Sequence, residues 1–377
     1  MSTFKVERTR IANIRIHDNA DKLELASVEN KTWQFVIRKG EFKNGDECIF
    51  FPVDSVLPQP LIEHLGIGNM MAGKEKNRIK TVKLRGYFSQ GFVCSIDIIQ
   101  KFLQKAATYT TYDVSVSCDI YIAVPTDGDI LTKALGVEKY DPPAIISNNA
   151  ILKKLPHFVE SYDIEGCDNF PNIVEMLMDQ PVYISEKLEG MNFGVSVDET
   201  GEVIVNQRNF SIYSKVSEGN ALAGEDFQPP AFIKVAHSEG LVDKVSRLQR
   251  EKYPNQTVTI RGEFLGPSSQ ANFYNLKEQT VRVFDIKVNG SYLPVDEFLA
   301  IVKEYDLKAV PCLSLGKTLR EWLDGKTVRE MSDGKSLMAD KPREGVVIKP
   351  MVESQVDGFG RLFIKQRGPE YLAKTDF

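Results

Sequence analysis

Lys187 is the residue whose surroundings point most directly to chemistry. It ends a strand-like segment, YISEK, and is followed by Leu188, Glu189 and Gly190. A lysine amine has a reference pKa of about 10.4, so a nucleophilic lysine needs neighbouring cations or burial that disfavour its charged form. The four residues KLEG alone are weak evidence, because a solvated lysine at a strand end has the same pattern. Residues elsewhere in the chain must decide between the two interpretations.

An ordered series of charged and aromatic residues follows Lys187, each in a strand-like segment. The series consists of Arg208 in VNQRNF, Glu263 in TIRGEFLG, Phe284 in VRVFDIKV, Glu344 in REGVVIKP and Lys365 in RLFIKQRG. Together these residues strongly resemble the motifs of the covalent nucleotidyltransferase superfamily, which contains ATP-dependent polynucleotide ligases and capping enzymes. The resemblance extends over residues 180 to 370.

The residues around Lys187 look most like one group within this superfamily, the RNA ligase 2 clade. In that clade a glutamate precedes the lysine, a glycine lies three residues after it and an asparagine five after it. The corresponding residues here are Glu186, Gly190 and Asn192. DNA ligases usually have the pattern KxDG, and Glu189 replaces its aspartate.

The resemblance implies an ATP-dependent RNA ligase that seals RNA ends or nicks carrying a 3′-hydroxyl and a 5′-phosphate, as in RNA repair. Lys187 would take AMP from ATP and pass it to the 5′-phosphate, and the 3′-hydroxyl would then displace AMP. All three steps are in-line phosphoryl displacements, so the site must position groups and neutralise phosphate charge. ATP is the implied co-substrate, and Glu344, Glu189 and Asn192 suit a hydrated Mg²⁺ or Mn²⁺.

The resemblance assigns the other residues to a nucleotide pocket. Glu186 would contact the adenine edge and Phe284 would stack on its face. Glu263 would hold the ribose hydroxyls, Arg208 would engage the ribose or a phosphate, and Asn192 belongs to the nucleotide pocket as well as to the metal site. Ordinary structural explanations also exist: a core aromatic for Phe284, a solvated charge for Arg208 and a strand-end cap for Glu263.

Three basic residues on apolar strands, Lys349, Lys365 and Arg367, complete the expected nucleotide site. They would carry positive charge to the α-phosphate, and the two lysines would also lower the pKa of Lys187. Arg367 stands where the clade has a lysine, which keeps the charge but changes its geometry. The same alternation would also suit half-buried strands whose lysines face solvent.

The first hundred or so residues predict a small antiparallel barrel. Short strand-like segments at 4–17, 23–29, 33–40, 47–57, 78–85 and 92–96 are separated by turn signals. Residues 14–58 resemble the OB-type tRNA-binding modules appended to synthetases, through matching turn residues from Asp18 to Leu23, and this resemblance implies nucleic-acid recognition. Residues 74–85 hold six basic residues and one acid, and we predict that Lys80, Lys83 and Arg85 among them bind RNA. A solvated loop and edge strand is the alternative.

Length and composition predict an α+β protein of two domains. For the 377 residues, with a net charge of −5, we expect an all-β OB-type barrel at 1–110, a linker at 111–150 and an antiparallel-sheet nucleotidyltransferase domain at 151–377, with helices at 232–252, 295–305 and 318–331. No apolar run could span a membrane and the start lacks a signal peptide, so we expect a cytoplasmic protein. We also expect a monomer. Five cysteines without a CxxC pair and four scattered histidines disfavour a disulfide framework or a zinc site.

Three alternatives remain: an ATP-dependent DNA ligase, another lysyl-nucleotidyltransferase such as a guanylyltransferase, and a non-catalytic OB-type RNA-binding protein. DNA ligases and capping enzymes carry an OB domain after the core, whereas here the barrel comes first and twelve residues follow Lys365. A binding module would not need the lysine, carboxylate and arginine motifs. The sequence leaves open whether the substrate is a nicked duplex, a broken tRNA or single strands.

Overall fold

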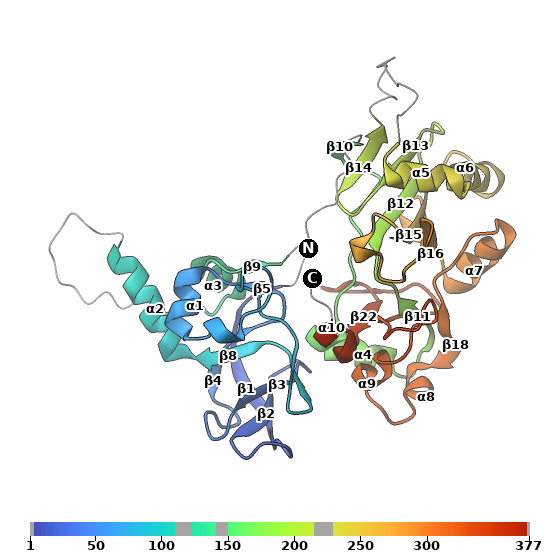
Figure 1. Cartoon of the computed structure of the whole chain (residues 1–377). Helices are drawn as coiled ribbons and strands as arrows, with labels where there is room; N and C mark the ends of the chain where they lie inside the picture. The colour runs from blue at the N-terminus through green and yellow to red at the C-terminus, as the bar shows by residue number, and fades with distance from the viewer. Residues whose placement is uncertain (1–3, 110–122, 141–149, 215–228, 375–377) are drawn as a thin grey trace. The chain divides into compact units, whose positions relative to one another are not determined.

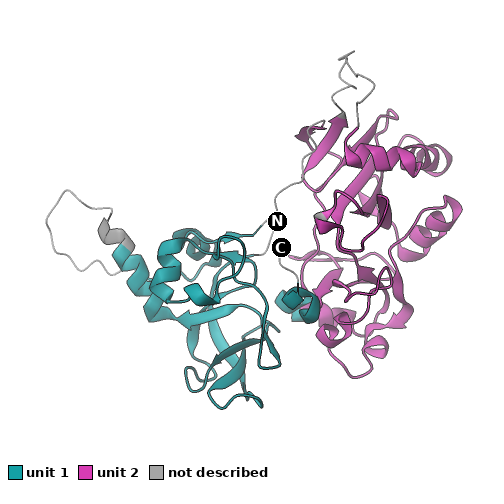
Figure 2. Cartoon of the chain, viewed as in Figure 1, with its two compact units in different colours: residues 1–142, 167–171, 369–377 teal, residues 143–166, 172–368 magenta. Residues whose placement is uncertain are grey.

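The computed structural model describes residues 4–109, 123–140, 150–214 and 229–374. The chain forms two compact units (Figure 2). Unit 1 comprises residues 1–142, 167–171 and 369–377, and unit 2 comprises residues 143–166 and 172–368. Of the expected linker, residues 111–122 and 141–149 lie outside the described residues, whereas residues 123–140 lie in unit 1.

Unit 1 is built on a five-stranded antiparallel sheet in the order β3-β2-β1-β4-β8 (Figure 1). Its strands are β1 (Glu7–Ile16), β2 (Leu23–Val28), β3 (Phe35–Arg38), β4 (Glu47–Phe51) and β8 (Phe92–Ser95). One end of β1 pairs with β4 and the other with β2, and the ladder shifts between Ala12 and Arg15. Such an irregularity bends a strand, so β1 connects two halves of a curved sheet. A hydrogen bond of 2.8 Å from Gln90 N to Gln34 O brings the two ends of the sheet together, which nearly closes it.

Two apolar cores stabilise unit 1. One lies inside the curved sheet and contains Ile11, Val28, Phe35, Phe50 and Val93. The other lies under α1 (Gln59–Leu65), α2 (Ile96–Tyr109) and α3 (Gly128–Ala134). The short strand β9 (Glu138–Lys139) pairs with β5 (Ser55–Val56). Residues 123–140 therefore form part of unit 1, with a helix and a strand of their own. The remaining short elements of unit 1 are η1 (Gly68–Met70), β6 (Val82–Leu84), β7 (Tyr87–Ser89), η2 (Cys167–Asn169) and α10 (Pro369–Lys374).

One member of the basic run at residues 74–85, Arg78, belongs to the interior of unit 1 and not to its surface. Arg78 is 8% exposed, and its guanidinium pairs with Asp54 at 2.6 Å. The guanidinium carbon also lies 3.6 Å from the centroid of the Tyr140 ring. A partly buried ion pair of this kind holds neighbouring segments together. The run is therefore not a continuous basic surface.

Unit 2 contains two main antiparallel sheets, ordered β10-β14-β13-β12-β15-β16-β17 and β18-β11-β19-β22 (Figure 1). The first consists of β10 (Ala150–Lys154), β12 (Met191–Val197), β13 (Val203–Asn206), β14 (Phe210–Ser214), β15 (Val258–Leu265), β16 (Thr280–Val288) and β17 (Ser291–Tyr292). The second consists of β11 (Pro181–Lys187), β18 (Cys312–Thr318), β19 (Gly345–Pro350) and β22 (Ile364–Arg367), and β20 (Gln355–Val356) pairs with β21 (Gly360–Arg361). The expected α+β class, with a barrel ahead of an antiparallel-sheet domain, is confirmed.

The helices of unit 2 differ in detail from the expected ones. The helix expected at 232–252 is two helices, α5 (Ala231–Ser238) and α6 (Leu241–Lys252), because Gly240 between them has a φ of +65°. The expected helix at 295–305 is α7 (Val295–Glu304), and that at 318–331 is α8 (Leu319–Leu323) and α9 (Val328–Ser332). Also present are α4 (Pro171–Leu177) and η3 (Gln270–Asn272). None of the helices in the described ranges has the length and apolar character needed to cross a membrane.

Candidate active site

Lys187 is the last residue of β11 and lies beside the start of β19. The two strands run antiparallel, with Lys187 opposite Gly345. This register places Glu344 next to Lys187, and Oε1 of Glu344 lies 2.6 Å from Nζ of Lys187. Gly345 permits the arrangement, because a Cβ atom there would collide with the carbonyl oxygen of Gln366 on β22. The strand pairing therefore brings together two residues of the motif series, Lys187 and Glu344.

Carboxylates, not cations, surround the Lys187 amine. Burial lowers the pKa of Lys187, but the carboxylates of Glu344, Glu263 and Glu189 outweigh burial and raise this pKa above its ordinary value. Burial also raises the pKa of Glu263 to about 8, in spite of the nearby Lys187 ammonium. We expected neighbouring lysines to lower the pKa of Lys187, and the structure places acids there instead. The carboxylates around Lys187 therefore favour the protonated form of its amine.

Three strands of the larger sheet bring Asn192, Glu263 and Arg282 into one row. Asn192 on β12 lies opposite Glu263 on β15, which in turn lies opposite Arg282 on β16. Directly opposite residues project from the same face of a sheet. Asn192 Oδ1 and Arg282 Nε are buried and have no hydrogen-bond partner among the described residues. The row thus offers an acceptor and a donor beside Glu263, and the motifs did not indicate Arg282.

Phe284 leaves the ladder of β16 at a β-bulge. The residues before and after it pair with Gly262 and Arg261 of β15, so Phe284 itself has no partner there. Its half-buried ring lies 4.9 Å from the Tyr162 ring, centroid to centroid, and packs against an apolar cluster that includes Leu188. Phe284 and Leu188, the residue after Lys187, therefore belong to one apolar cluster.

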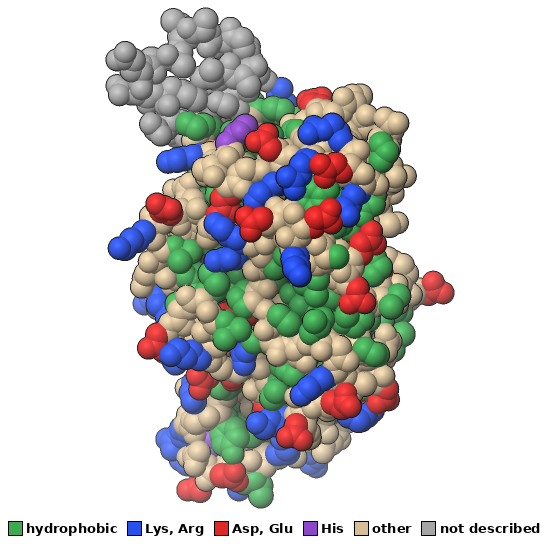
Figure 3. All heavy atoms as spheres, turned by 90° about the vertical axis from the view of Figure 1, so that its right-hand side faces the viewer, with side chains coloured by type: hydrophobic (Ala, Val, Ile, Leu, Met, Phe, Trp, Pro, Cys, Tyr) green, Lys and Arg blue, Asp and Glu red, His purple; other side chains and the backbone are tan. Residues whose placement is uncertain are grey.

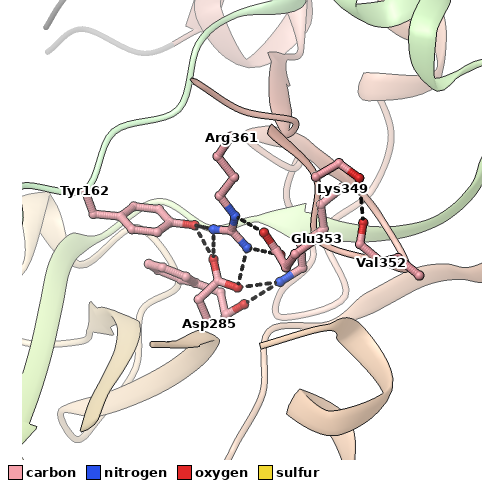
Figure 4. Close-up of polar contacts among 8 residues, drawn as sticks. Tyr162, Asp285, Lys349, Val352, Glu353 and Arg361 are labelled. Carbon is pink, nitrogen blue, oxygen red and sulfur yellow. Dashed lines mark hydrogen bonds and ion pairs between the residues drawn. The ribbon is translucent and has the colours of Figure 1, made fainter. Parts of the chain in front are cut away.

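A buried cluster of charges anchors the strand segment that carries Phe284 (Figure 4). Asp285 accepts hydrogen bonds from Lys349 at 2.7 Å and from Arg361 at 2.7 and 3.0 Å. It also accepts one from the Tyr162 hydroxyl at 2.5 Å. Burial raises the pKa of Asp285, but the two cations outweigh burial and hold it well below its usual range. Because Lys349 Nζ also donates to the Phe284 carbonyl at 2.9 Å, the cluster fixes the backbone of the bulge.

Lys349 belongs to the same cluster. It is 3% exposed and lies four residues along β19 from Gly345, the partner of Lys187. Four residues of a strand span about 13 Å. The Lys349 ammonium supports the Phe284 segment from the interior, and its expected role at the α-phosphate stays a prediction.

Arg208 and Lys365 converge on Asp163, a residue outside every motif. Oδ2 of Asp163 lies 2.5 Å from Arg208 Nη2, and its Oδ1 lies 3.5 Å from Lys365 Nζ. The Lys365 N–H donates to the Glu165 carbonyl at 2.9 Å, which ties this segment to β22. Arg367 ends β22 and is half-buried. Two cations expected to bind phosphate are thus already gathered around one anion.

The two carboxylate oxygens of Glu186 lie in different environments. Glu186 is 1% exposed, and its Oε2 accepts a hydrogen bond of 2.8 Å from the Leu337 N–H. Burial raises the pKa of Glu186, and the nearby Ser336 hydroxyl, the Leu337 N–H and Arg343 oppose the rise. Oε1 is buried and has no hydrogen-bond partner in the described part of the chain, so its acceptor capacity is unused.

The oxygen atoms near Lys187 fit a hydrated divalent cation. Glu344 Oε2 and Asn192 Oδ1 are buried and accept no hydrogen bond from any described residue, and Glu189 is 7% exposed. Carboxylate and amide oxygens suit Mg²⁺ and Mn²⁺. Within the described ranges, no three His, Cys, Asp or Glu side chains are grouped so as to bind a metal directly. The residues therefore fit an ion that keeps most of its water.

The residues expected to bind RNA lie on unit 1, around the hairpin of β6 and β7. Lys83 and Arg85 are exposed on this hairpin, and Lys80 just before it is half-buried. Asn19 Nδ2 donates to the Arg85 carbonyl at 3.1 Å, which fixes the hairpin to the turn after β1. On the face of the molecule that Figure 3 shows, basic and acidic side chains are interspersed.

A lysine at a strand end, next to carboxylates and an aromatic platform, defines a nucleotidyltransferase site of the polynucleotide ligase class. Residues 180–366 match the family described as RNA ligase, and residues 6–96 match an OB-fold domain. The chain belongs to the RNA ligase family and carries an OB-fold domain ahead of its ligase domain. The expected family and the expected order of the two domains are confirmed.

Solved structures of Naegleria gruberi RNA ligase are similar to the whole chain. An apo mutant is 26% identical with a TM-score of 0.73, and the match covers 100% of this chain and 99% of that one. A mutant with AMP and Mn is 25% identical with a TM-score of 0.72, covering 98% of each chain. A mutant with ATP and Mn is 24% identical with a TM-score of 0.72, again covering 98% of each. The comparison with curated proteins gave no match.

Proposed function

We infer that this RNA ligase uses ATP and a divalent metal to join RNA ends through a lysyl-AMP intermediate on Lys187. The observation that carries the inference is the Lys187–Glu344 pair at 2.6 Å, in the region that matches the RNA ligase family. ATP and a divalent metal agree with the ligands of the similar Naegleria ligase structures. The buried oxygens around Lys187 and the aromatic platform at Phe284 support the same nucleotide and metal.

In the first step, Nζ of Lys187 attacks the α-phosphorus of ATP. An N–P bond forms, the bond to the pyrophosphate oxygen breaks, and the amine loses a proton to solvent. A divalent cation held through water by Glu344, Glu189 and Asn192 would supply positive charge that neutralises both these acids and the phosphates. Loss of the acids' negative charge lowers the pKa of Lys187 and frees its lone pair.

The raised pKa of Lys187 favours the second step. An oxygen of the RNA 5′-phosphate attacks the adenylyl phosphorus, and the N–P bond to Lys187 breaks. An amine leaves readily only when it takes up a proton, and the carboxylates around Lys187 stabilise its protonated form. In the third step the RNA 3′-hydroxyl attacks the 5′-phosphorus and AMP leaves.

RNA ends with a 3′-hydroxyl and a 5′-phosphate are the substrates that this chemistry requires. We assign Arg208, Lys365 and Arg367 to the phosphates of the nucleotide. Lys365 and Arg367 lie on β22, which pairs with β19, and Arg208 shares the Asp163 carboxylate with Lys365. Lys83 and Arg85, with Lys80, are assigned to the RNA backbone because phosphate contacts are made mainly by exposed basic side chains. The enzyme acts as a monomer in this proposal.

Labelling with ATP that carries the label on its α-phosphate tests the first step. Wild-type protein should retain the label on a denaturing gel, and Lys187→Ala should not. Lys317→Ala, which changes an exposed lysine at the end of another strand of the same sheet, is the matched control and should be labelled normally. Wild-type protein and Lys317→Ala should also seal a nicked RNA duplex, and Lys187→Ala should not. Label retained by Lys187→Ala would refute the assignment.

A further inference from the structure

The segment that follows Lys187 crosses from one sheet of unit 2 to the other. Lys187 ends β11 in the four-stranded sheet, and β12, which begins at Met191, belongs to the seven-stranded sheet. Glu189, in the middle of this crossing, lies outside the ladders of both strands. Its backbone N–H donates instead to the Tyr274 hydroxyl oxygen at 2.9 Å. Because a buried N–H group needs a partner and Glu189 is 7% exposed, this bond holds the backbone two residues after the nucleophile.

Tyr274 is packed so that its hydroxyl has little freedom to move. It is 5% exposed and lies in the apolar cluster that also contains Leu188. The Phe273 ring meets the Tyr274 ring edge-on, with 5.0 Å between their centroids. The Lys341 ammonium donates to the Phe273 carbonyl at 2.6 Å, which fixes the backbone next to Tyr274. The apolar cluster and the Tyr274 hydroxyl therefore support consecutive residues of the crossing, Leu188 and Glu189.

The loop that carries Tyr274, residues 266–279 between β15 and β16, has a strained backbone. Four of its residues other than glycine have a positive φ: Ser268 at +72°, Ala271 at +51°, Asn272 at +47° and Asn275 at +52°. Such conformations are unfavourable for residues with a side chain and persist only where the surroundings enforce them. Here the Asn272 side chain does so, because it donates to the Leu276 carbonyl at 2.8 Å and accepts from the Leu276 N–H at 3.0 Å. Tyr274 lies inside this strained and closely bonded stretch, which fixes its place.

We propose that Tyr274 positions residues 187–190 for adenylylation, by holding the Glu189 backbone and with it the Lys187 amine and the Glu189 carboxylate. Tyr274 is a positioning residue, since it acts on the nucleotide and the metal only through this segment. The proposal rests on the proposed function, because it takes Lys187 as the nucleophile and Glu189 as a residue that holds the metal's water. A reacting group displaced by about 1 Å can lose roughly 100-fold in rate, so a small relaxation of the segment is enough to be measured.

The test compares Tyr274→Phe with the wild-type enzyme in the formation of the lysyl-AMP adduct, over series of ATP and Mg²⁺ concentrations. Phenylalanine keeps the ring and removes only the oxygen that accepts from Glu189. At saturating ATP and Mg²⁺ the rate of adduct formation should fall by roughly 10- to 100-fold. The Mg²⁺ concentration that gives half the maximal rate should rise several-fold, because the Glu189 carboxylate is displaced. The ATP concentration for half the maximal rate, measured at saturating Mg²⁺, should stay unchanged.

Tyr305→Phe is the matched control. Tyr305 is a buried tyrosine of the same unit, 2% exposed, whose hydroxyl donates to Glu251 at 2.8 Å. This variant should form the adduct as the wild-type enzyme does. If Tyr274→Phe does not fold, Asn272→Gly replaces it, because glycine accepts the positive φ and only the two side-chain bonds to Leu276 are lost. It should show a lower rate and a higher Mg²⁺ requirement, in the same pattern.

Three results would overturn the proposal. An unchanged rate and Mg²⁺ requirement in the folded variants would show that the segment does not depend on Tyr274. A smaller fraction of labelled protein, with an unchanged rate for that fraction, would show that Tyr274 serves only stability. A higher ATP requirement at an unchanged maximal rate would assign Tyr274 to nucleotide binding. Failure of the wild-type enzyme to form any adduct would instead refute the proposed function, so the failures are distinguishable.

Discussion

Replacing Asp163 with asparagine should strengthen ATP binding, because it removes the carboxylate that holds Arg208 and Lys365 in the nucleotide-free enzyme. Both ion pairs must separate before these cations can bind phosphate. Their lengths are 2.5 and 3.5 Å, and the Asp163 side chain is 38% exposed. Each such partly exposed pair contributes about 0.2 to 1 kcal/mol. Removing both should therefore lower the Kd for ATP by roughly 2- to 30-fold.

The assay is equilibrium binding of ATP to Asp163→Asn, repeated at several salt concentrations. The gain in affinity should shrink as salt rises, because partly exposed ion pairs are screened. Asp179→Asn is the matched control, since Asp179 forms an exposed pair with Arg320 at 2.7 Å in the same unit. The control should leave ATP binding unchanged. Weaker ATP binding in Asp163→Asn would refute the reasoning, because it would show that Asp163 orients the cations for phosphate instead of competing with it.

Three further predictions concern the base platform, its anchor and the RNA-binding hairpin. Phe284→Ala should raise the KM for ATP by roughly 5- to 150-fold, since loss of base stacking costs about 1 to 3 kcal/mol; reduced thermal stability with unchanged ATP binding would assign Phe284 to the core. Asp285→Asn should lower the free energy of unfolding by about 3 to 5 kcal/mol, because two buried cations lose their partner. The pKa of Asp285 is depressed in the folded state, so this stability is present at neutral pH and lost as the pH falls, and melts of the variant should depend less on acid pH than those of wild type. Lys83→Ala combined with Arg85→Ala should reduce the slope of log affinity for RNA against log salt by up to about 2 without affecting adenylylation, and an unchanged slope would exclude the hairpin from the RNA-binding surface.

The strands that the sequence predicted are those that bury most of their residues. β15 buries seven of its eight residues and β16 six of its nine. β18 was missed because it buries none of its seven residues fully, so it lacks the apolar run of a core strand. The helix at 232–252 was predicted as one element because apolar spacing continues across Gly240, where the left-handed backbone ends one helix and starts the next.

The site was predictable where it lies on strands and not where loops complete it. The motif order identified Lys187 and Glu344, and the pairing of β11 with β19 brings them together. Asp163 and Leu337 carry no motif, and they contact Lys365 and Glu186 only because the fold brings distant parts of the chain together; the bond from Leu337 to Glu186, for example, spans 151 residues. The burial of Lys349 was also not predictable, because a lysine in an apolar strand has the same pattern whether it faces solvent or a buried aspartate.

The bulge at Phe284 sets a limit on how this enzyme could be stabilised by design. In a regular strand, consecutive side chains point to opposite faces, and every backbone group has a partner in the ladder. A redesign that deleted one residue from β16 would restore the ladder next to Arg261 and Gly262 and make the sheet more regular. It would also shift the register on one side of the deletion, so Phe284 and Asp285 could not both keep their present neighbours. A more regular sheet here would therefore displace the Phe284 ring that is proposed to stack on the base, and activity would fall as stability rose. Libraries of variants made to stabilise the enzyme should leave this segment unchanged.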